Sequence, residues 1–306
     1  MLIAYQYYRK IIFFIIIFLA FLNCEEQYNS KWGVIFIENE SSSIHNEEII
    51  KIANEQYEYL IREFEKVNIS PLKIIITNSN NIRSNIWKWS LGITKGNKII
   101  IKDPAIAHIT KSKFIKVLRH ELNHLYLNRI SNKKINIPRW FEEGFAMRYA
   151  SENSLRHKLI IASNINSNEL YDINTINQKF HSNSKRTFNF AYAYSSLLVN
   201  NLPKFYSKDA INQILKNIKT GNSFDEAFYL STFSSIEHYN KRIYNLITSK
   251  YKWFNLIQFP NFLLVLTPLL LIIGFIYKRI KNKKIIKKWE LEEELLNSEI
   301  DNHEEE

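Results

Sequence analysis

The chain has a single cysteine, Cys24, among its 306 residues. An intramolecular disulfide is therefore excluded, and the fold must depend on its hydrophobic core and on any metal that it binds. We find no internal repeat and no nucleic-acid-binding motif, and the basic residues behind the formal net charge of +11 are spread along the chain. No nucleic-acid partner is therefore expected. Hydrophobic residues make up 46% of the sequence, which is ample for a real core.

The first 24 residues are typical of a targeting segment. Arg9 and Lys10 precede an unbroken apolar run from Ile11 to Leu22, whose length suits a signal peptide better than a complete membrane span. The run ends in Phe-Leu-Asn-Cys at Cys24, which weakly resembles a bacterial lipoprotein box. Residues 1–24 are thus predicted to be a signal peptide, with possible lipidation at Cys24, or an uncleaved signal anchor.

A second apolar stretch, from Phe254 to Tyr277, contains no charged residue. As a helix it would extend roughly 36 Å, enough to cross a ~30 Å hydrocarbon core, so a transmembrane helix is predicted. Lysine and arginine residues follow between 278 and 288, and the positive-inside rule assigns the charged tail, 278–306, to the cytoplasm. We therefore expect a protein of the cell membrane whose main domain, residues 25–250, lies on the extracytoplasmic side.

The hydrophobic pattern of that domain predicts an α+β fold, with a small N-terminal mixed sheet followed by a mainly helical half. Strands are expected at 31–37, 72–77, 91–94 and 98–102, the last two joined by a turn at Gly96-Asn97. Helices are expected at 47–66, 112–128, 139–151, 190–202, 209–220, 223–229 and 235–250. Residues 153–185 are polar and are predicted to form a loop that could border a cleft.

The clearest chemical signal is the string HELNH at residues 120–124. Residues four apart lie on one face of a helix, so His120 and His124 can both face one metal ion. Glu121 lies beside them, where its carboxylate can reach a metal-bound water without binding the metal itself. This residue pattern is that of a hydrolytic zinc site.

A catalytic zinc ion normally has three protein ligands, so a third ligand is expected further along the chain. Glu143 lies 19 residues after His124, in a predicted helix that follows Pro138. A loop at 130–137 would let this helix run antiparallel to the first and return the carboxylate to the histidines.

At these residues the sequence resembles the gluzincin metallopeptidases, and in particular their peptidase MA-like branch. The string Trp-Phe-Glu-Glu-Gly-Phe-Ala at residues 140–146 is similar to the Trp-x-x-Glu-Gly-x-Ala signature around the third zinc ligand of aminopeptidase-N-type enzymes. The resemblance implies a gluzincin-like fold, and it makes Glu143 the ligand and not Glu142. It also implies a sheet edge that holds an extended peptide, with the strand at 98–102 as its predicted position.

The resemblance further implies a zinc metallopeptidase with one zinc ion per chain, peptide or protein substrates and Glu121 as the base that activates the zinc-bound water. The aminopeptidase string Gly-x-Met-Glu-Asn is missing, which favours an endopeptidase. Gluzincins use a tyrosine or a histidine to stabilise the oxyanion. Tyr192 is the candidate for that role and Tyr194 the alternate, and an ordinary core tyrosine is the competing interpretation.

Two other interpretations stay open at this point. The chain could be a membrane-anchored zinc-binding scaffold that no longer cleaves peptides, or its helices could bind no metal. Replacement of Glu121 and metal analysis distinguish these possibilities.

Overall fold

The computed structural model describes residues 26–67, 71–78, 90–131, 135–152, 155–164, 172–251 and 259–304. Two compact units divide the chain, Met1–Ser249 and Lys250–Glu306, and each is described by itself. The predicted signal segment, residues 1–24, lies outside the described residues.

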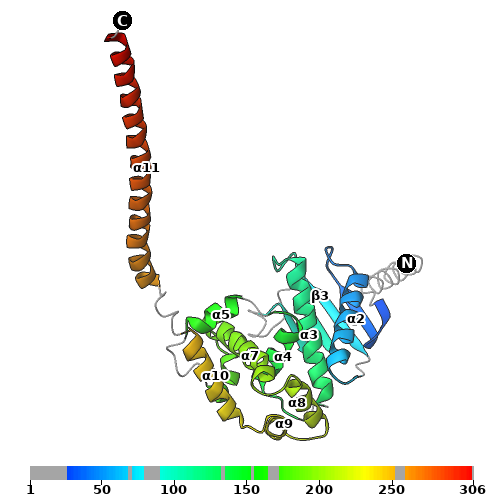
Figure 1. Cartoon of the computed structure of the whole chain (residues 1–306). Helices are drawn as coiled ribbons and strands as arrows, with labels where there is room; N and C mark the ends of the chain where they lie inside the picture. The colour runs from blue at the N-terminus through cyan, green and yellow to red at the C-terminus, as the bar shows by residue number, and fades with distance from the viewer. Residues whose placement is uncertain are drawn as a thin grey trace, which may run out of the picture. The chain divides into compact units, whose positions relative to one another are not determined.

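The first unit begins with a five-stranded sheet in the order β1-β2-β3-β5-β4. Figure 1 labels its central strand β3. Its strands are β1 Glu26–Ser30, β2 Gly33–Asn39, β3 Leu72–Thr77, β4 Gly92–Lys95 and β5 Lys98–Lys102. The central strands β2, β3 and β5 are parallel, whereas β1 and β4 pair antiparallel at the two edges. The predicted mixed sheet is thus confirmed. Strand β1 was not expected, because its residues, EQYNS, are polar and half-exposed or exposed.

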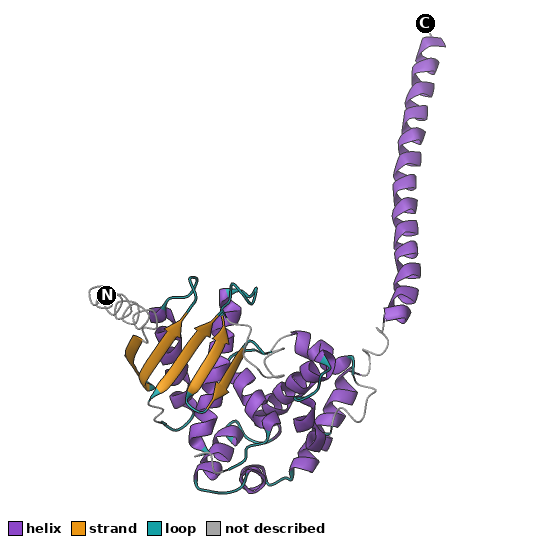
Figure 2. Cartoon of the chain, turned by 180° about the vertical axis from the view of Figure 1, so that it is seen from behind, coloured by secondary structure: helices purple, strands orange, loops and turns teal. Residues whose placement is uncertain are grey.

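Alternating isoleucine and leucine side chains give the sheet one fully buried face. Leu72, Ile74 and Ile76 on β3 are buried, as are Ile99 and Ile101 on β5. Helices α2 (Asn46–Glu63) and α3 (Lys111–Ile130) lie on one side of the sheet, and Figure 2 shows the strands from the opposite side. The sheet and these two helices therefore form the layered base that positions the first residues of the site.

Strand β4 is the edge of the sheet that lies next to α3. The β4–β5 hairpin turns at Gly96 and Asn97 as predicted, and Gly96 has a φ of +63°, which glycine adopts without steric cost. The strand at 98–102, predicted as the edge, is β5 and pairs on both sides with β3 and β4. The prediction was wrong by one strand, since β5 pairs with β3 and leaves its hairpin partner β4 at the edge.

The remainder of the first unit is helical, as predicted. Beyond α3 its helices are α4 Arg139–Tyr149, α5 Leu155–Ala162, α6 Ile173–Lys179, α7 Lys185–Phe205, α8 Ala210–Lys219, α9 Phe224–Thr232 and α10 Ile236–Tyr251. Helix α3 is capped at its N-terminus by Thr110, whose side chain accepts a hydrogen bond from the backbone N–H of Lys113. Helix α4 follows Pro138, whose fixed φ favours a helix start.

Helices α3 and α4 run antiparallel and are joined by buried polar contacts. The Asn123 side chain donates to the carbonyl oxygen of Ala146 and accepts a hydrogen bond from Gln56 of α2, which also donates to the carbonyl oxygen of Tyr149. All of these groups are buried with partners, so the network fixes the relative position of three helices.

Helix α4 also packs closely against α7, and a glycine makes this approach possible. A Cβ atom on Gly144 would lie 2.3 Å from the backbone oxygen of Ser195 and 2.5 Å from Val199. No larger residue fits without separating the helices. The glycine that follows Glu143 is therefore required by packing, and it holds α4 at the depth where Glu143 meets α3.

The polar segment predicted as a loop at 153–185 contains two short helices in its described part. Helix α5 buries only Ile161 and Ala162. Helix α6 is capped by Asp172, whose side chain accepts from the backbone N–H of Asn174, and it buries Ile173 and Ile176. The loop prediction was wrong here because one or two buried residues per helix give too weak a periodic signal.

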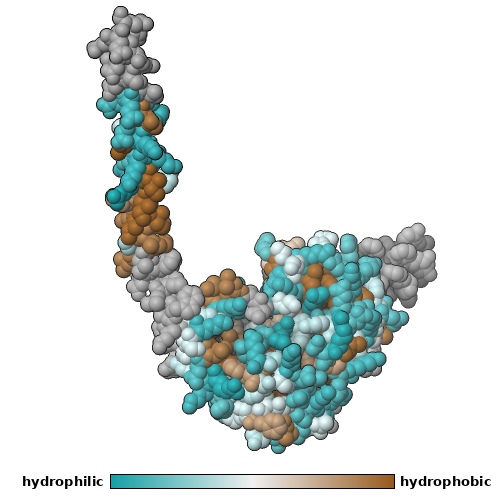
Figure 3. Space-filling model, in the orientation of Figure 1, coloured by the Kyte–Doolittle hydropathy of each residue, from teal (hydrophilic) through white to brown (hydrophobic). Residues whose placement is uncertain are grey.

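The second unit contains α11, Phe259–Glu304, which continues through Pro268. Figure 3 shows hydrophobic residues around its first part and hydrophilic residues further along. Among the residues that the structure describes, no helix combines the length and the apolar character needed to cross a bilayer. The predicted span at 254–277 is therefore not found in that part of the chain. Its first residues, 254–258, lie outside the described residues, so only residues 259–277 of the predicted span are described.

Candidate metal centre

Three side chains from α3 and α4 place one ligand atom each at a common point. Nε2 of His120 lies 3.1 Å from Nε2 of His124, and Oε2 of Glu143 lies 3.2 Å from the His120 nitrogen and 3.3 Å from the His124 nitrogen. Glu143 is 3% exposed and His120 is 8% exposed. The residues predicted from the two sequence strings are thus brought together.

The triangle has the dimensions of a tetrahedral metal site. Ligand atoms at about 2.0–2.1 Å from zinc in a tetrahedron are separated by roughly 3.3 Å. The separations of 3.1–3.3 Å match this value on all three sides. Two imidazoles and one carboxylate are also the ligand set of hydrolytic zinc sites, which leave a fourth position for water or substrate. His120, His124 and Glu143 can therefore hold a divalent metal ion.

The electrostatics of the cluster favour an ionised carboxylate facing the imidazoles. Burial would raise the pKa of Glu143, but the charge of His124 and the hydrogen bonds to both histidines hold it well below its usual range. Burial lowers the pKa of His120, yet the hydrogen bond to Glu143 and the charges of Glu152, Glu143 and Glu121 outweigh burial and raise it to about 9. The site thus attracts a cation at this point, a proton or a metal ion.

Arg139 fixes the other oxygen of Glu143. Its Nε and one terminal nitrogen each lie 3.2 Å from Oε1 of Glu143, one helical turn further along α4. The two carboxylate oxygens therefore have separate roles, because Oε1 accepts from Arg139 while Oε2 faces the histidines. The neighbouring Glu142 lies outside this cluster of three ligands, and burial raises its pKa.

Glu121 lies beside the ligands and is held by the edge strand. The Thr94 hydroxyl lies 2.7 Å from Oε2 of Glu121, and a Cβ atom on Gly92 would lie 2.8 Å from Oε1. Glu121 is 5% exposed. Burial raises its pKa, while the charges of His120 and His124 and the Thr94 hydrogen bond oppose this rise. Such an environment suits a carboxylate that must both take and return a proton.

These residues line a cleft of about 610 Å³, which has the size of a ligand site. Strand β4 lines it with Gly92, Ile93 and Thr94. Tyr192 of α7 also lines the cleft, and burial and the charge of Glu143 raise its pKa well above the ordinary value. The alternate, Tyr194, is fully buried and donates to Oδ1 of Asn240 at 2.6 Å, away from the cleft lining.

Three residues that the sequence did not single out belong to this site: Thr94, Arg139 and Glu152. Oε2 of Glu152 lies 3.8 Å from Nδ1 of His120, and its other oxygen lies 3.4 Å from Nζ of Lys113. Nδ1 of His120 is buried and has no hydrogen-bond partner, so Glu152 is the nearest carboxylate available to orient this imidazole.

The site combines a sheet edge, a helix that carries two histidines and a buried glutamate, and a second helix that brings another glutamate to them. This combination defines a peptidase-type hydrolase. The peptidase MA superfamily matches residues 67–249, and the chain belongs to this superfamily. This agrees with the resemblance to the gluzincin metallopeptidases. No curated protein matches the chain.

Proposed function

We propose that the chain is a zinc-dependent endopeptidase that hydrolyses peptide bonds in its cleft. The observation that carries this proposal is the triangle of His120, His124 and Glu143 with sides of 3.1–3.3 Å, next to the buried Glu121. Membership of the peptidase MA superfamily supports a peptidase reaction, and the two-histidine, one-carboxylate ligand set supports zinc.

Three residues of the chain, Glu121, Tyr192 and Thr94, would have separate roles in the hydrolysis. A bound zinc ion supplies Lewis-acid chemistry, which lowers the pKa of water and polarises a carbonyl group. Glu121 takes a proton from the attacking water and returns it to the leaving amine. Tyr192 donates a hydrogen bond to the developing oxyanion, since it lines the same cleft as Glu121. Thr94 holds the Glu121 carboxylate by its hydrogen bond.

Internal cleavage is supported by the edge strand. Strand β4 has a free edge among the described strands and lines the cleft, so an extended peptide can add to it by main-chain hydrogen bonds. Backbone pairing of this kind requires no free peptide terminus. The missing Gly-x-Met-Glu-Asn string agrees with this mode of binding.

The function is tested with the full-length chain and Glu121→Gln. Both proteins are analysed for metal content and are incubated with unstructured proteins and with peptides blocked at both ends. We expect about one zinc ion per chain in each and internal cleavage by the unsubstituted chain only. Equal metal content without any Glu121-dependent cleavage would instead identify a zinc-binding scaffold.

The metal ligands are tested by two neighbouring substitutions. Glu143→Gln should lose zinc, because a neutral amide replaces the carboxylate that faces both histidines. Glu142→Gln should keep its zinc, because Glu142 lies outside the cluster of ligands. Zinc content is measured by elemental analysis after dialysis. Equal loss in both variants would contradict the assigned ligand set.

We also propose that the chain is anchored in the cell membrane by 254–277, with residues 25–250 on the extracytoplasmic side and 278–306 in the cytoplasm. This rests on the charge-free sequence and on the basic residues after it. The full chain should stay with membranes during alkaline extraction, and replacement of Leu270 and Leu271 by Asp should release it where residues 1–24 are cleaved as a signal peptide without lipidation at Cys24. Release of the unsubstituted chain would refute the anchor but not the peptidase function.

A further inference from the structure

Arg139, the first residue of α4, contacts side chains from three segments of the chain. Its guanidinium reaches Oε1 of Glu143 with two nitrogens, each at 3.2 Å. It also forms a hydrogen bond with Tyr192 of α7, and it lies 5.4 Å from the centroid of the Phe180 ring. Arg139, Glu143 and Tyr192 all line the cleft. One side chain therefore contacts both the proposed third metal ligand and the proposed oxyanion donor.

Aromatic rings hold Tyr192 next to Arg139. The Phe180 ring makes an edge-on contact with the Tyr192 ring at 5.2 Å between centroids, and the Phe188 ring lies 4.8 Å from it. Phe180 contacts both Arg139 and Tyr192, so the two side chains share a neighbour. The close approach of α4 to α7 fixes the helices that carry them. The contact between Arg139 and Tyr192 is thus supported by packing on several sides.

The chemistry of the two groups decides which of them donates the hydrogen bond. A guanidinium has five N–H donors and no acceptor, so the oxygen of Tyr192 must accept from Arg139. The hydroxyl hydrogen of Tyr192 is then left for an acceptor in the cleft, such as a developing oxyanion. Burial and the charge of Glu143 raise the pKa of Tyr192, and the charge and hydrogen bond of Arg139 oppose this rise. A phenol beside a cation is a stronger donor than an isolated one.

We propose that Arg139 is a positioning residue that holds the Tyr192 hydroxyl as the oxyanion donor while it orients the Glu143 carboxylate. This inference rests on the proposed peptidase function and adds to it a residue that links the metal ligand to the oxyanion donor. Arginine suits both tasks, because its planar fork can donate to two partners at once.

The substitution Arg139→Lys separates the two contacts. Lysine offers one ammonium group, which the ionised carboxylate of Glu143 attracts more strongly than the neutral hydroxyl of Tyr192. The contact with Glu143 should therefore remain, and the contact with Tyr192 should be lost. Arg139→Gln removes the charge and should weaken both contacts.

A double-mutant cycle with Tyr192→Phe tests the link in the full-length, zinc-loaded protein. Tyr192→Phe should lower kcat about 100-fold, and Arg139→Lys about 10-fold, on peptides blocked at both ends. In the Tyr192→Phe background, Arg139→Lys should change kcat by less than about two-fold, because the hydroxyl on which it acts is already gone. KM should change little in each variant, since the oxyanion forms only in the transition state.

Two further measurements require no turnover. The first is the affinity for a ten-residue alanine–serine peptide, blocked at both ends, in which a phosphonamidate replaces the central peptide bond. Its anionic oxygen represents the oxyanion, so the same cycle should show the same coupling between Arg139 and Tyr192. The second is zinc affinity, measured by chelator competition. It should stay within about three-fold in Arg139→Lys and Tyr192→Phe and fall about 10-fold in Arg139→Gln, where Glu143 loses its partner.

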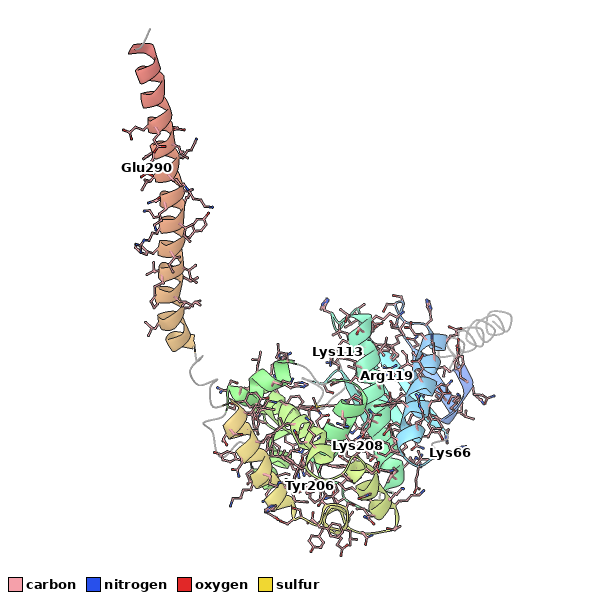
Figure 4. All side chains as sticks on the ribbon, in the orientation of Figure 1. Lys66, Lys113, Arg119, Tyr206, Lys208 and Glu290 are labelled. Atoms are coloured by element: carbon pink, nitrogen blue, oxygen red, sulfur yellow. The ribbon has the colours of Figure 1, made fainter. Side chains whose placement is uncertain are left out.

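Arg119→Lys is the matched control. Figure 4 labels Arg119 on α3, where it forms an ion pair with Glu55 at 3.0 Å. Its side chain is 32% exposed, against 33% for Arg139, but it does not line the cleft. This substitution should leave kcat, phosphonamidate affinity and zinc affinity unchanged. The midpoint of thermal unfolding is measured for every variant, and the same cycle is run with Arg139→Gln in case Arg139→Lys does not fold.

Each outcome either supports or overturns the inference. Loss of the Arg139→Lys effect in the Tyr192→Phe background, at unchanged zinc affinity, supports it. An equal effect of Arg139→Lys with and without the Tyr192 hydroxyl overturns it, as does an equal loss in Arg119→Lys. A decrease in activity that follows zinc content alone also overturns it. Phosphonamidate binding that depends jointly on Arg139 and Tyr192, without any cleavage by the unsubstituted chain, would refute the peptidase function and leave the link between the two residues in place.

Discussion

The hydroxyl of Thr94 lies 2.7 Å from Oε2 of Glu121 and 3.0 Å from the backbone carbonyl oxygen of the same residue. Gly92, two residues earlier on β4, leaves room for the other oxygen of that carboxylate. The strand that lines the cleft therefore also sets the position of the proposed general base. The proposed substrate binding and the proposed proton transfer would therefore both involve one element of the sheet.

Removal of the Thr94 hydroxyl should weaken catalysis without removing the metal. In Thr94→Val the shape of the side chain is kept, but the buried carboxylate of Glu121 loses its hydrogen-bond donor. A hydrogen bond to a charged group contributes about 1.5–3 kcal/mol, so kcat/KM should fall about 10- to 100-fold. The loss should appear in kcat more than in KM, because Glu121 acts on the reacting atoms.

Thr94→Ser is the matched control for this prediction. It keeps the hydroxyl and should retain kcat/KM within about three-fold of the unsubstituted chain, since only a methyl group is removed. Zinc content and the midpoint of thermal unfolding are measured for both variants. Equal activity of the Val and Ser variants would show that the hydrogen bond has no role in positioning Glu121.

Gly144→Ala should destabilise the protein, because α4 and α7 have no space for the added methyl group. Its Cβ atom would lie 2.3 Å from the backbone oxygen of Ser195, which cannot move without displacing the helix. We expect a loss of about 3 kcal/mol in the free energy of unfolding, the upper range for overpacking. Urea denaturation provides the measurement.

A second helical glycine provides the control. Gly274 has no atom within 4 Å of the position of its added Cβ. Gly274→Ala should therefore leave the urea midpoint of the first unit unchanged, since Gly274 lies on α11 in the second unit. If both substitutions lower the midpoint equally, the close approach of α4 to α7 is not the cause.

The proposed ligands were predictable from the sequence, two of them from the spacing that helix geometry sets and the third from the resemblance to the gluzincin metallopeptidases. His120 and His124 share a helix face, and Glu143 is marked by the glycine that follows it. The packing of Gly144 against α7 gives a physical reason for this glycine. The placement of Tyr192 in the cleft agrees with its selection as a candidate, whereas Tyr194 is buried against Asn240.

The supporting residues were not predictable in this way. Thr94 and Glu152 reach the site from segments 27 residues before Glu121 and 32 residues after His120, and no periodic pattern connects them. Strand β1 and helices α5 and α6 were also missed, because their residues are mainly polar and bury few side chains. A sequence pattern indicates which face of a helix or strand is buried. It does not indicate contacts between polar side chains from distant segments.

Glu152→Gln should weaken zinc binding. The Glu152 carboxylate faces Nδ1 of His120, which is buried without a hydrogen-bond partner. Carboxylates in this position orient an imidazole ligand and raise its basicity, and their loss typically costs 10- to 100-fold in metal affinity, so a loss of about 10-fold is expected. Competition with a chromophoric chelator measures the affinity directly.

The control is Glu48→Gln, which removes another carboxylate paired with a lysine of α3, Lys111 at 2.7 Å. Glu48 is remote from the ligands, so zinc affinity should stay the same. A decrease in both variants would indicate a general effect of lost negative charge. An unchanged affinity in Glu152→Gln would exclude Glu152 as the orienting group.

The metal-free chain should become less stable as pH rises from 6.5 to about 9. His120 has a pKa of about 9 in the folded chain against an ordinary value of 6.5, because the hydrogen bond to Glu143 and nearby carboxylates outweigh the effect of burial. A group whose pKa is raised by folding contributes its full stabilisation below the unfolded pKa. That stabilisation is lost as pH rises through the folded pKa.

The expected loss in the free energy of unfolding is up to about 3 kcal/mol over this interval. Zinc must displace the same proton, so zinc affinity should rise with pH until about 9 and then level off. Urea denaturation of the metal-free protein at several pH values checks the first expectation, and chelator competition checks the second. Glu143→Gln removes the main partner of protonated His120, and its stability should vary much less over the same range. A metal-free chain whose stability is constant between pH 6.5 and 9 would mean that His120 is neutral there, and that the triangle of ligands is held by packing of α3 against α4 alone.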